Sequence, residues 1–165
     1  MNTFIDDLSS GKPYDQGKIT GYSDDEISKI ERLYDIKVNG FFRSFLKFSG
    51  RCCGGLLGDD PIILYRNSWT VRAQLLFQIG LFDEMQENSH YEYLKYKPFC
   101  FSLEGEIQYY FIMTSHRDSE SVFSFNENTG DITNRFIIMK DYIKKIIQNH
   151  TDVNNHAASG ELIKI

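Results

Sequence analysis

The 165-residue chain carries 18 lysine and arginine residues against 23 aspartate and glutamate residues, so its formal net charge at pH 7 is −5. Hydrophobic residues make up 41% of the chain and charged residues 25%, proportions that are typical of a globular protein and exclude wholesale disorder. The length predicts one domain. Because a net negative charge is repelled by nucleic acids and by anionic membranes, we expect neither as a partner and expect a basic partner instead.

The cysteines and the N-terminal sequence indicate the cellular compartment. The chain has three cysteines, and two of them, Cys52 and Cys53, are adjacent, which makes a poor disulfide framework and points to a reducing environment. The first residues lack the basic and apolar regions of a secretory signal. No apolar stretch approaches the roughly 20 residues that cross a bilayer. We therefore expect a cytoplasmic protein.

The first firm structural signal is a helix that begins after Ser23. Ser23 and Glu26 have the spacing of a capping box, in which each side chain accepts a backbone N–H at the start of a helix. Ile27, Ile30 and either Leu33 or Tyr34 follow at three- and four-residue spacing, so this helix has one apolar face.

A second helix is predicted after a short connector. Asn39 is its candidate N-cap, and Gly50 is expected to end it with a positive φ. Its aromatic stripe, which we assign to the core, consists of Phe41, Phe45 and Phe48. Together the two helices predict a helical hairpin.

The centre of the chain begins with a glycine-rich loop over residues 50–61. Residues 62–65 are predicted to form a short strand, and residues 68–79 a helix that Gly80 ends. Residues 81–97 combine acidic and aromatic side chains, which makes this segment a candidate contact surface.

The rest of the sequence predicts two β-hairpins and a closing helix. The first hairpin pairs residues 98–103 with 107–113, and the second pairs residues 121–125 with 131–134. The closing helix, from Met139 onward, turns its isoleucines inward and its lysines outward. This order of elements predicts an α+β fold, in which an N-terminal helix pair packs on a mostly antiparallel sheet and a C-terminal helix closes the domain.

The segment 23–50 resembles the opening of the SUKH superfamily, the Smi/Knr-type proteins, which has an acidic helix start, an Ile-x-x-Ile/Leu-Glu pair and an aromatic helix that ends in a glycine-rich turn. The matching positions are Ile27, Ile30 and Glu31 in the first helix and Phe42, Phe45 and Leu46 in the second. Residues 99–147 are also similar to the family, with Ser-Glu-Ser-Val-Phe at 119–123 as the edge that leads to the final helix. The chain departs from the family at Val38-Asn39, where Leu-Pro is usual.

The resemblance implies both a domain division and a function. It divides the chain into an N-terminal extension (1–16), whose order depends on apolar residues such as Ile5 and Leu8 docking on the body, a SUKH-like domain (17–148) and a C-terminal tail (149–165) that we interpret as an appendage. It implies an immunity protein that binds and neutralises a cognate contact-dependent or polymorphic bacterial toxin, with a nuclease as the expected toxin. Because the family has no shared catalytic residues, we expect a binding protein and not an enzyme.

The expected partner is the C-terminal toxin domain of such a protein, and the acidic, aromatic segment is the candidate surface that binds it. Acidic side chains would orient a basic toxin while tyrosines anchor the contact. The candidate residues are Asp83, Glu84, Glu87, Tyr91, Glu92, Tyr93 and Tyr96, with Asp59 and Asp60 as weaker candidates. The alternative is an ordinary solvated face, with Tyr91 and Tyr93 on one side of an edge strand.

The cysteines and the glycine-rich loop do not match the motifs of a metal site or a phosphate-binding site. Cys52, Cys53 and Cys100 lack the paired spacing of a zinc site, so we expect no metal and no cofactor and assign the adjacent pair to a tight structural loop. The glycine-rich loop lacks the lysine and hydroxyl residue of a phosphate-binding loop. Two alternatives to an immunity protein stay open: a non-catalytic regulatory scaffold or interaction module, and a small enzyme that uses Cys52 or Cys53.

Overall fold

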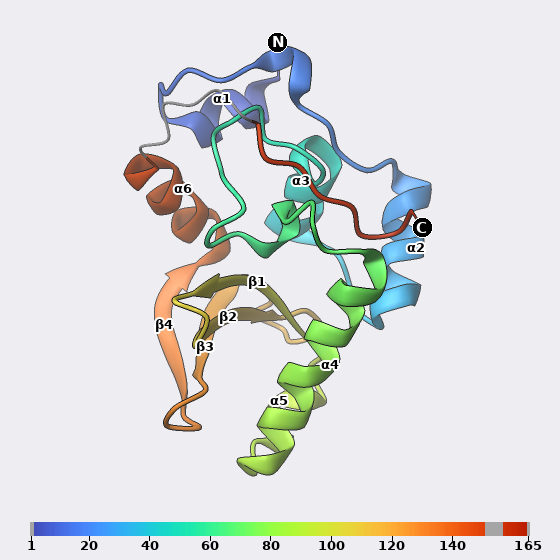
Figure 1. Ribbon diagram of the computed structural model, residues 1–165, viewed down its shortest axis with the longest axis vertical. Helices are drawn as coiled ribbons and strands as arrows, with labels where there is room; N and C mark the ends of the chain where they lie inside the picture. Colours follow the sequence, from blue (N-terminus) through green and yellow to red (C-terminus); the bar gives the residue numbers. More distant parts are fainter. Residues whose placement is uncertain (1, 151–156, 165) are drawn as a thin grey trace.

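An antiparallel sheet with the strand order β1-β2-β3-β4 lies between two groups of helices (Figure 1). The computed structural model describes residues 2–150 and 157–164. The strands are β1 (Pro98–Glu104), β2 (Gln108–Met113), β3 (Ser121–Asn126) and β4 (Ile132–Ile138). The helices are α1 (Thr3–Ser9), α2 (Asp24–Tyr34), α3 (Gly40–Ser49), α4 (Val71–Glu87), α5 (Tyr91–Leu94) and α6 (Met139–Asn149), with 3₁₀ turns η1 (Gln16–Lys18) and η2 (Ile63–Tyr65). The α+β prediction is confirmed, with both hairpins and the closing helix in place.

Each face of the sheet has its own apolar cluster, because successive side chains of a strand point to opposite faces. On β1, Phe99 and Phe101 belong to the larger cluster, whereas Cys100 between them belongs to the smaller one. The larger cluster receives apolar residues from α1, α2, α3 and α6. The smaller cluster is covered by α4, through Leu81 and Met85, and by α5.

The predicted helix pair forms α2 and α3. Ser23 and Glu26 make the capping box, since the Ser23 hydroxyl accepts the Glu26 N–H and the Glu26 carboxylate accepts the Ser23 N–H. Asp24 joins the two helices through ion pairs to Arg43 (2.8 Å) and Lys47 (2.9 Å). The start of one helix therefore also holds the second helix in position.

The ends of α3 differ from expectation in detail. Asn39 stands at the N-cap, but its side chain makes no capping bond and instead accepts the Ser119 hydroxyl. Gly50 has φ −59°, so the expected positive φ is wrong. A side chain at this position would clash with its neighbours, because a Cβ atom would lie 2.6 Å from both the Tyr22 ring and the Leu46 carbonyl oxygen. In the phenylalanine stripe, Phe45 is fully buried and Phe48 is 38% exposed.

The N-terminal segment and the C-terminal segment both pack on the body. Ile5 and Leu8 of α1 are buried, as expected. At the other end, Leu162 is fully buried; its N–H donates to the Tyr22 hydroxyl (3.0 Å), and its carbonyl accepts the Tyr34 hydroxyl (2.8 Å). Residues 157–164, which we call the strap, are thus docked, and the expectation of an appendage is wrong for them. Residues 151–156 and 165 of the predicted tail lie outside the described residues.

Two predictions for the centre of the chain are also wrong. Residues 63–65 form the 3₁₀ turn η2, with only Ile62 bridging to Ser102 of β1, because a short apolar run does not distinguish a strand from another buried segment. Helix α4 starts later than predicted, with Thr70 as its N-cap, and runs through Gly80. Burial of residues beyond the glycine outweighs its cost, which is about 1 kcal/mol inside a helix.

The guanidinium group of Arg51 also holds the strap. Arg51 forms ion pairs with Glu26 of α2 (3.0 Å) and with Glu161 of the strap (2.8 Å), and it lies 4.0 Å from the centre of the Tyr22 ring. The hydrogen bond from Arg51 and the bond from the Ser23 N–H lower the pKa of Glu26 from its ordinary 4.5 to about 2. Protonation of this carboxylate would therefore weaken the fold.

We expect stability to fall on the acid side in a way that depends on Glu26. A group with a lowered folded-state pKa stabilises the protein above its unfolded pKa, and this contribution disappears as the pH falls from 4.5 towards 2. Glu26→Gln should lower the free energy of unfolding at pH 7 and flatten its decline below pH 4.5. Urea unfolding at several pH values measures this, and an unchanged acid slope would contradict it.

Phe136 on β4 is an exposed aromatic residue in a left-handed conformation. One residue of β3, Val122, faces three residues of β4 at a bulge between the pairs Ser121–Ile138 and Phe123–Asn134. Within the bulge Phe136 has φ 53°, its N–H donates to the Asn134 side chain, and the residue is 92% exposed. A left-handed backbone costs roughly 1–2 kcal/mol for a residue with a Cβ atom.

Phe136→Gly should therefore stabilise the protein. We expect the free energy of unfolding to rise by about 1 kcal/mol, because glycine adopts a positive φ without strain and little packing is lost. Phe136→Ala is the matched control, which removes the ring but keeps the Cβ atom and should change little. Lower stability of the glycine variant in urea unfolding would show that the ring supports the fold.

Candidate functional site

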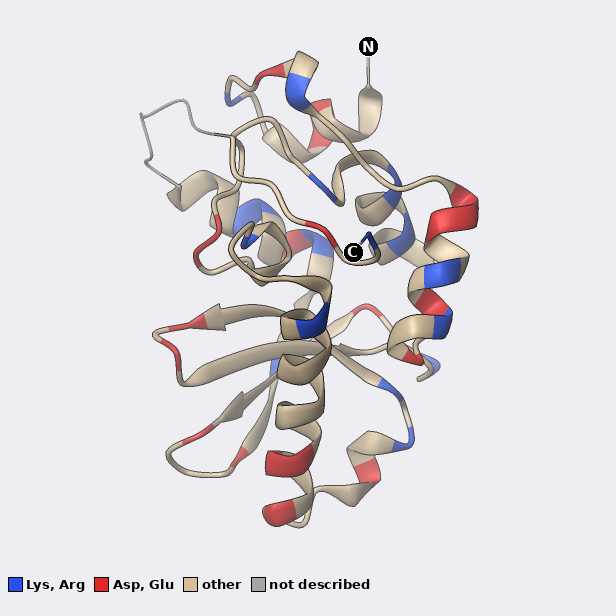
Figure 2. Ribbon diagram, turned by 45° about the vertical axis from the view of Figure 1, so that its right-hand side comes forward, with Lys and Arg blue, Asp and Glu red and all other residues tan. Residues whose placement is uncertain are grey.

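The predicted contact residues of the segment 81–97 lie on α4, on α5 and just after them. Asp83, Glu84 and Glu87 occupy the second half of α4, and Tyr91, Glu92 and Tyr93 belong to α5. In Figure 2 acidic residues, drawn in red, gather at the end of α4 and in the segment that follows it. The edge-strand alternative for Tyr91 and Tyr93 is wrong, because these residues form a short helix.

Unlike several acidic side chains elsewhere, those of this region form no ion pairs within the described part of the chain. On α1 and α2, Asp7 and Asp24 each pair with two basic side chains. Among the residues that the structure describes, no ion pair involves the acidic side chains of the segment 81–94. This segment also contains no lysine or arginine. The acidic surface, as we call it, consists of Asp83, Glu84, Glu87, Tyr91 and Glu92.

The three tyrosines of the segment have different environments. Tyr91 is 63% exposed and free for contact. Tyr93 is half-buried and meets Phe111 and Phe123 of the sheet edge-on, at 6.5 and 6.1 Å between ring centres. Tyr96 packs edge-on against His116 at 4.5 Å. Tyr93 and Tyr96 therefore support the smaller cluster, and only Tyr91 presents an exposed ring to a partner.

The weaker candidates, Asp59 and Asp60, are exposed in the loop between α3 and η2. The structure does not bring them to the acidic surface, since in Figure 1 this loop lies near α6, towards the opposite end of the long axis from α5. The Asp59 carbonyl accepts a hydrogen bond from Arg66. Any contact that includes both regions would have to extend along the protein.

Two polar side chains that the sequence did not single out fix the position of the acidic surface. Gln78, buried in α4, donates to the Cys100 carbonyl (2.8 Å) and accepts the Cys100 N–H (2.9 Å), so it binds α4 to the backbone of β1 as a paired strand would. The His90 ring, between α4 and α5, bonds the Gly130 carbonyl at 2.6 Å. A glutamine on the buried side of a helix is the only signal that the sequence offers for the first of these bonds.

The cysteines are buried and poorly suited to nucleophilic chemistry. Burial raises the pKa of both the Cys53 and the Cys100 thiols to about 12, so very little thiolate is present at neutral pH. Cys52 and Cys53 lie in the loop after α3, in agreement with a structural role. Within residues 2–150 and 157–164, no group of three or more histidine, cysteine or acidic side chains is arranged to hold a metal ion.

Comparison with protein-family models, with curated proteins and with solved structures finds no match. Among the described residues, no helix has the length and apolar character needed to span a membrane.

Thiol labelling tests the assignment of the cysteines. We expect all three thiols to resist a disulfide reagent at neutral pH in the native protein and to react at once in denaturant, because all three are buried. For Cys53 and Cys100, burial also raises the thiol pKa and so suppresses the reactive thiolate. Rapid modification of Cys52 or Cys53 in the folded protein would contradict this and would favour the enzyme alternative.

Proposed function

We propose that the protein is a cytoplasmic immunity protein that neutralises a cognate bacterial toxin domain by stoichiometric binding, without catalysis. The proposed toxin is a contact-dependent or polymorphic toxin, with nuclease activity as the expected chemistry. The observation that carries the proposal is the acidic surface, in which four carboxylates on α4 and α5 form no ion pairs among the described residues and the side chain of Tyr91 is exposed. The resemblance of residues 23–50 to SUKH proteins supports the same function.

The acidic surface has the properties of a site for a basic protein. Carboxylates that are not neutralised within the molecule attract a positively charged partner over the Debye length, about 8 Å at physiological salt, and raise the association rate. A nuclease needs a basic groove to hold its substrate, so a cluster of carboxylates can occupy that groove in place of phosphates. Binding there would exclude the substrate and stop the toxin.

Tyr91 adds an exposed aromatic ring to the carboxylates of the acidic surface. Aromatic residues are among the most frequent energetic anchors of protein interfaces, because they bury a large area and lose little conformational freedom. Charges at the rim act mainly on the association rate, whereas a central anchor slows dissociation. The combination of Tyr91 with the flanking Glu87 and Glu92 therefore favours a tight and salt-sensitive complex.

Co-expression with the product of the immediately upstream gene, which is where the resemblance to SUKH immunity proteins implies that the toxin is encoded, tests this function. The wild-type protein should restore growth. A triple variant with Glu87→Lys, Tyr91→Ala and Glu92→Lys should fail to protect, because it reverses the charge and removes the anchor, and its affinity should fall at least about 100-fold. Tyr93 is left unchanged because its ring packs on the sheet.

Asp141→Lys on α6 is the matched control, since Asp141 is an exposed acidic residue on a different helix. This variant should protect as well as the wild type. Full protection by the folded triple variant would place the interface elsewhere on the molecule. Failure of the wild-type protein to protect would contradict the proposed function itself.

A further inference from the structure

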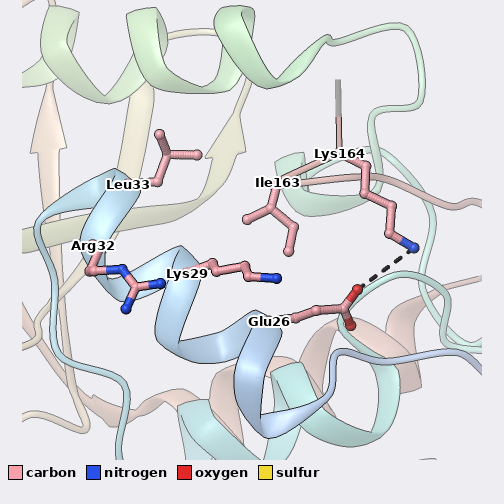
Figure 3. A pocket seen from close by; sticks show the side chains of 6 residues that line it. All are labelled: Glu26, Lys29, Arg32, Leu33, Ile163 and Lys164. Atoms are coloured by element: carbon pink, nitrogen blue, oxygen red, sulfur yellow. Dashed lines mark ion pairs between the residues drawn. The ribbon is translucent and has the colours of Figure 1, made fainter.

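A pocket of about 440 Å³, open to solvent, lies between α2 and the strap (Figure 3). Its lining consists of Glu26, Lys29, Arg32 and Leu33 from α2, with Ile163 and Lys164 from the strap. The volume is within the range of small-ligand and peptide-side-chain sites, roughly 300–1,000 Å³. Neither the acidic surface nor the function proposed for it uses this pocket.

The pocket combines apolar walls with basic side chains. Leu33 lies outside the buried face of α2, which consists of Ile27, Ile30 and Tyr34, and is 43% exposed. In Figure 3 Leu33 and Ile163 approach the same space from opposite sides. Within the described residues, Arg32 has no ion pair. An apolar side chain of a ligand could therefore bind between the walls while an acidic group meets Arg32.

The other two basic side chains of the pocket, Lys29 and Lys164, form only exposed ion pairs within the described part of the protein. Lys29 pairs with Asp25 at 2.9 Å and Lys164 with Glu26 at 3.6 Å, and both lysine side chains are more than half exposed. Exposed pairs of this kind contribute about 0–1 kcal/mol, so either lysine can turn to a ligand at little cost. Glu26 is already bonded to Arg51, which leaves the pocket with an excess of positive charge in an otherwise acidic protein.

We propose that this pocket binds an acidic peptide segment of a partner protein, with an apolar side chain between its carboxylates. The apolar side chain would pack between Leu33 and Ile163, and the flanking carboxylates would pair with Arg32 and the two lysines. A nucleic acid fits less well, because the net charge of −5 repels it and the apolar walls would stay uncovered.

The pocket exists only while the strap is docked, because Ile163 and Lys164 form one of its walls. The neighbouring Leu162 is held by its burial and by the hydroxyls of Tyr22 and Tyr34, so this wall is already in place before a ligand arrives. A peptide that binds the docked form must in turn stabilise docking by the same free energy. Peptide binding and strap docking are therefore coupled.

Titration of the ¹⁵N-labelled protein with the peptide acetyl-Glu-Glu-Leu-Glu-Glu-amide, followed by NMR, tests the proposal. We expect shifts confined to amides of residues 26–33 and 161–164, and a dissociation constant near 1 mM or below. Arg32→Glu should weaken binding about tenfold or more, whereas Arg72→Glu, which alters an exposed arginine on α4, should leave it unchanged. The peptide should also slow hydrogen exchange in the strap.

Two further arms separate a specific site from general attraction to lysines. The peptide acetyl-Gln-Gln-Leu-Gln-Gln-amide should bind at least about tenfold more weakly, and Ile163→Ser, which removes an apolar wall that is only half-buried, should weaken binding several-fold without unfolding the protein. Equal binding of the glutamine peptide, shifts spread over the surface, or indifference to Arg32→Glu would each overturn the proposal. None of these outcomes depends on the toxin.

Discussion

The ion pairs of Arg51 with Glu26 and Glu161 are the charged interaction that joins the strap to the start of α2. Glu26 serves both in the capping box of α2, where its carboxylate accepts the Ser23 N–H, and as a partner of Arg51, so the start of the helix and the docking of the strap share one carboxylate. Removing one partner from such a partly buried pair leaves the other without compensation, which costs more than the pair contributes. The strap in turn provides Leu162 to the larger cluster and Ile163 to the pocket beside α2.

The acidic surface lies on α4 and α5, which cover the face of the sheet that carries the smaller cluster. Gln78 and His90 hold α4 and the start of α5 against the backbone of β1 and of the β3–β4 turn, while Tyr93 packs on β2 and β3. These contacts fix a rigid platform from which the carboxylates and Tyr91 project. Because the platform is already ordered, a partner would lose little conformational entropy of this protein on binding.

The sequence correctly predicted the elements that depend on neighbouring residues. Its predictions were wrong where contacts between residues far apart in the chain determine the structure. The Ser23–Glu26 capping box, both hairpins and the closing helix follow from spacing that a few neighbouring residues carry. The course of α4 through Gly80, the turn at residues 63–65 and the docking of the strap depend on burial against residues far away in the chain. At the candidate site, the sequence identified the acidic side chains but did not separate the exposed Tyr91 from Tyr93, because their difference lies only in packing against Phe111 and Phe123.

Electrostatic attraction to a basic partner is the physical basis of the proposed function, and the salt dependence of a purified complex measures this attraction most directly. Calorimetric titration of the protein with the toxin domain of the neighbouring gene should give a one-to-one complex. Its affinity should fall steeply as the salt concentration rises, because the carboxylates of α4 and α5 act through charges that salt screens. Absence of binding, or an affinity that salt leaves unchanged, would contradict the proposed attraction.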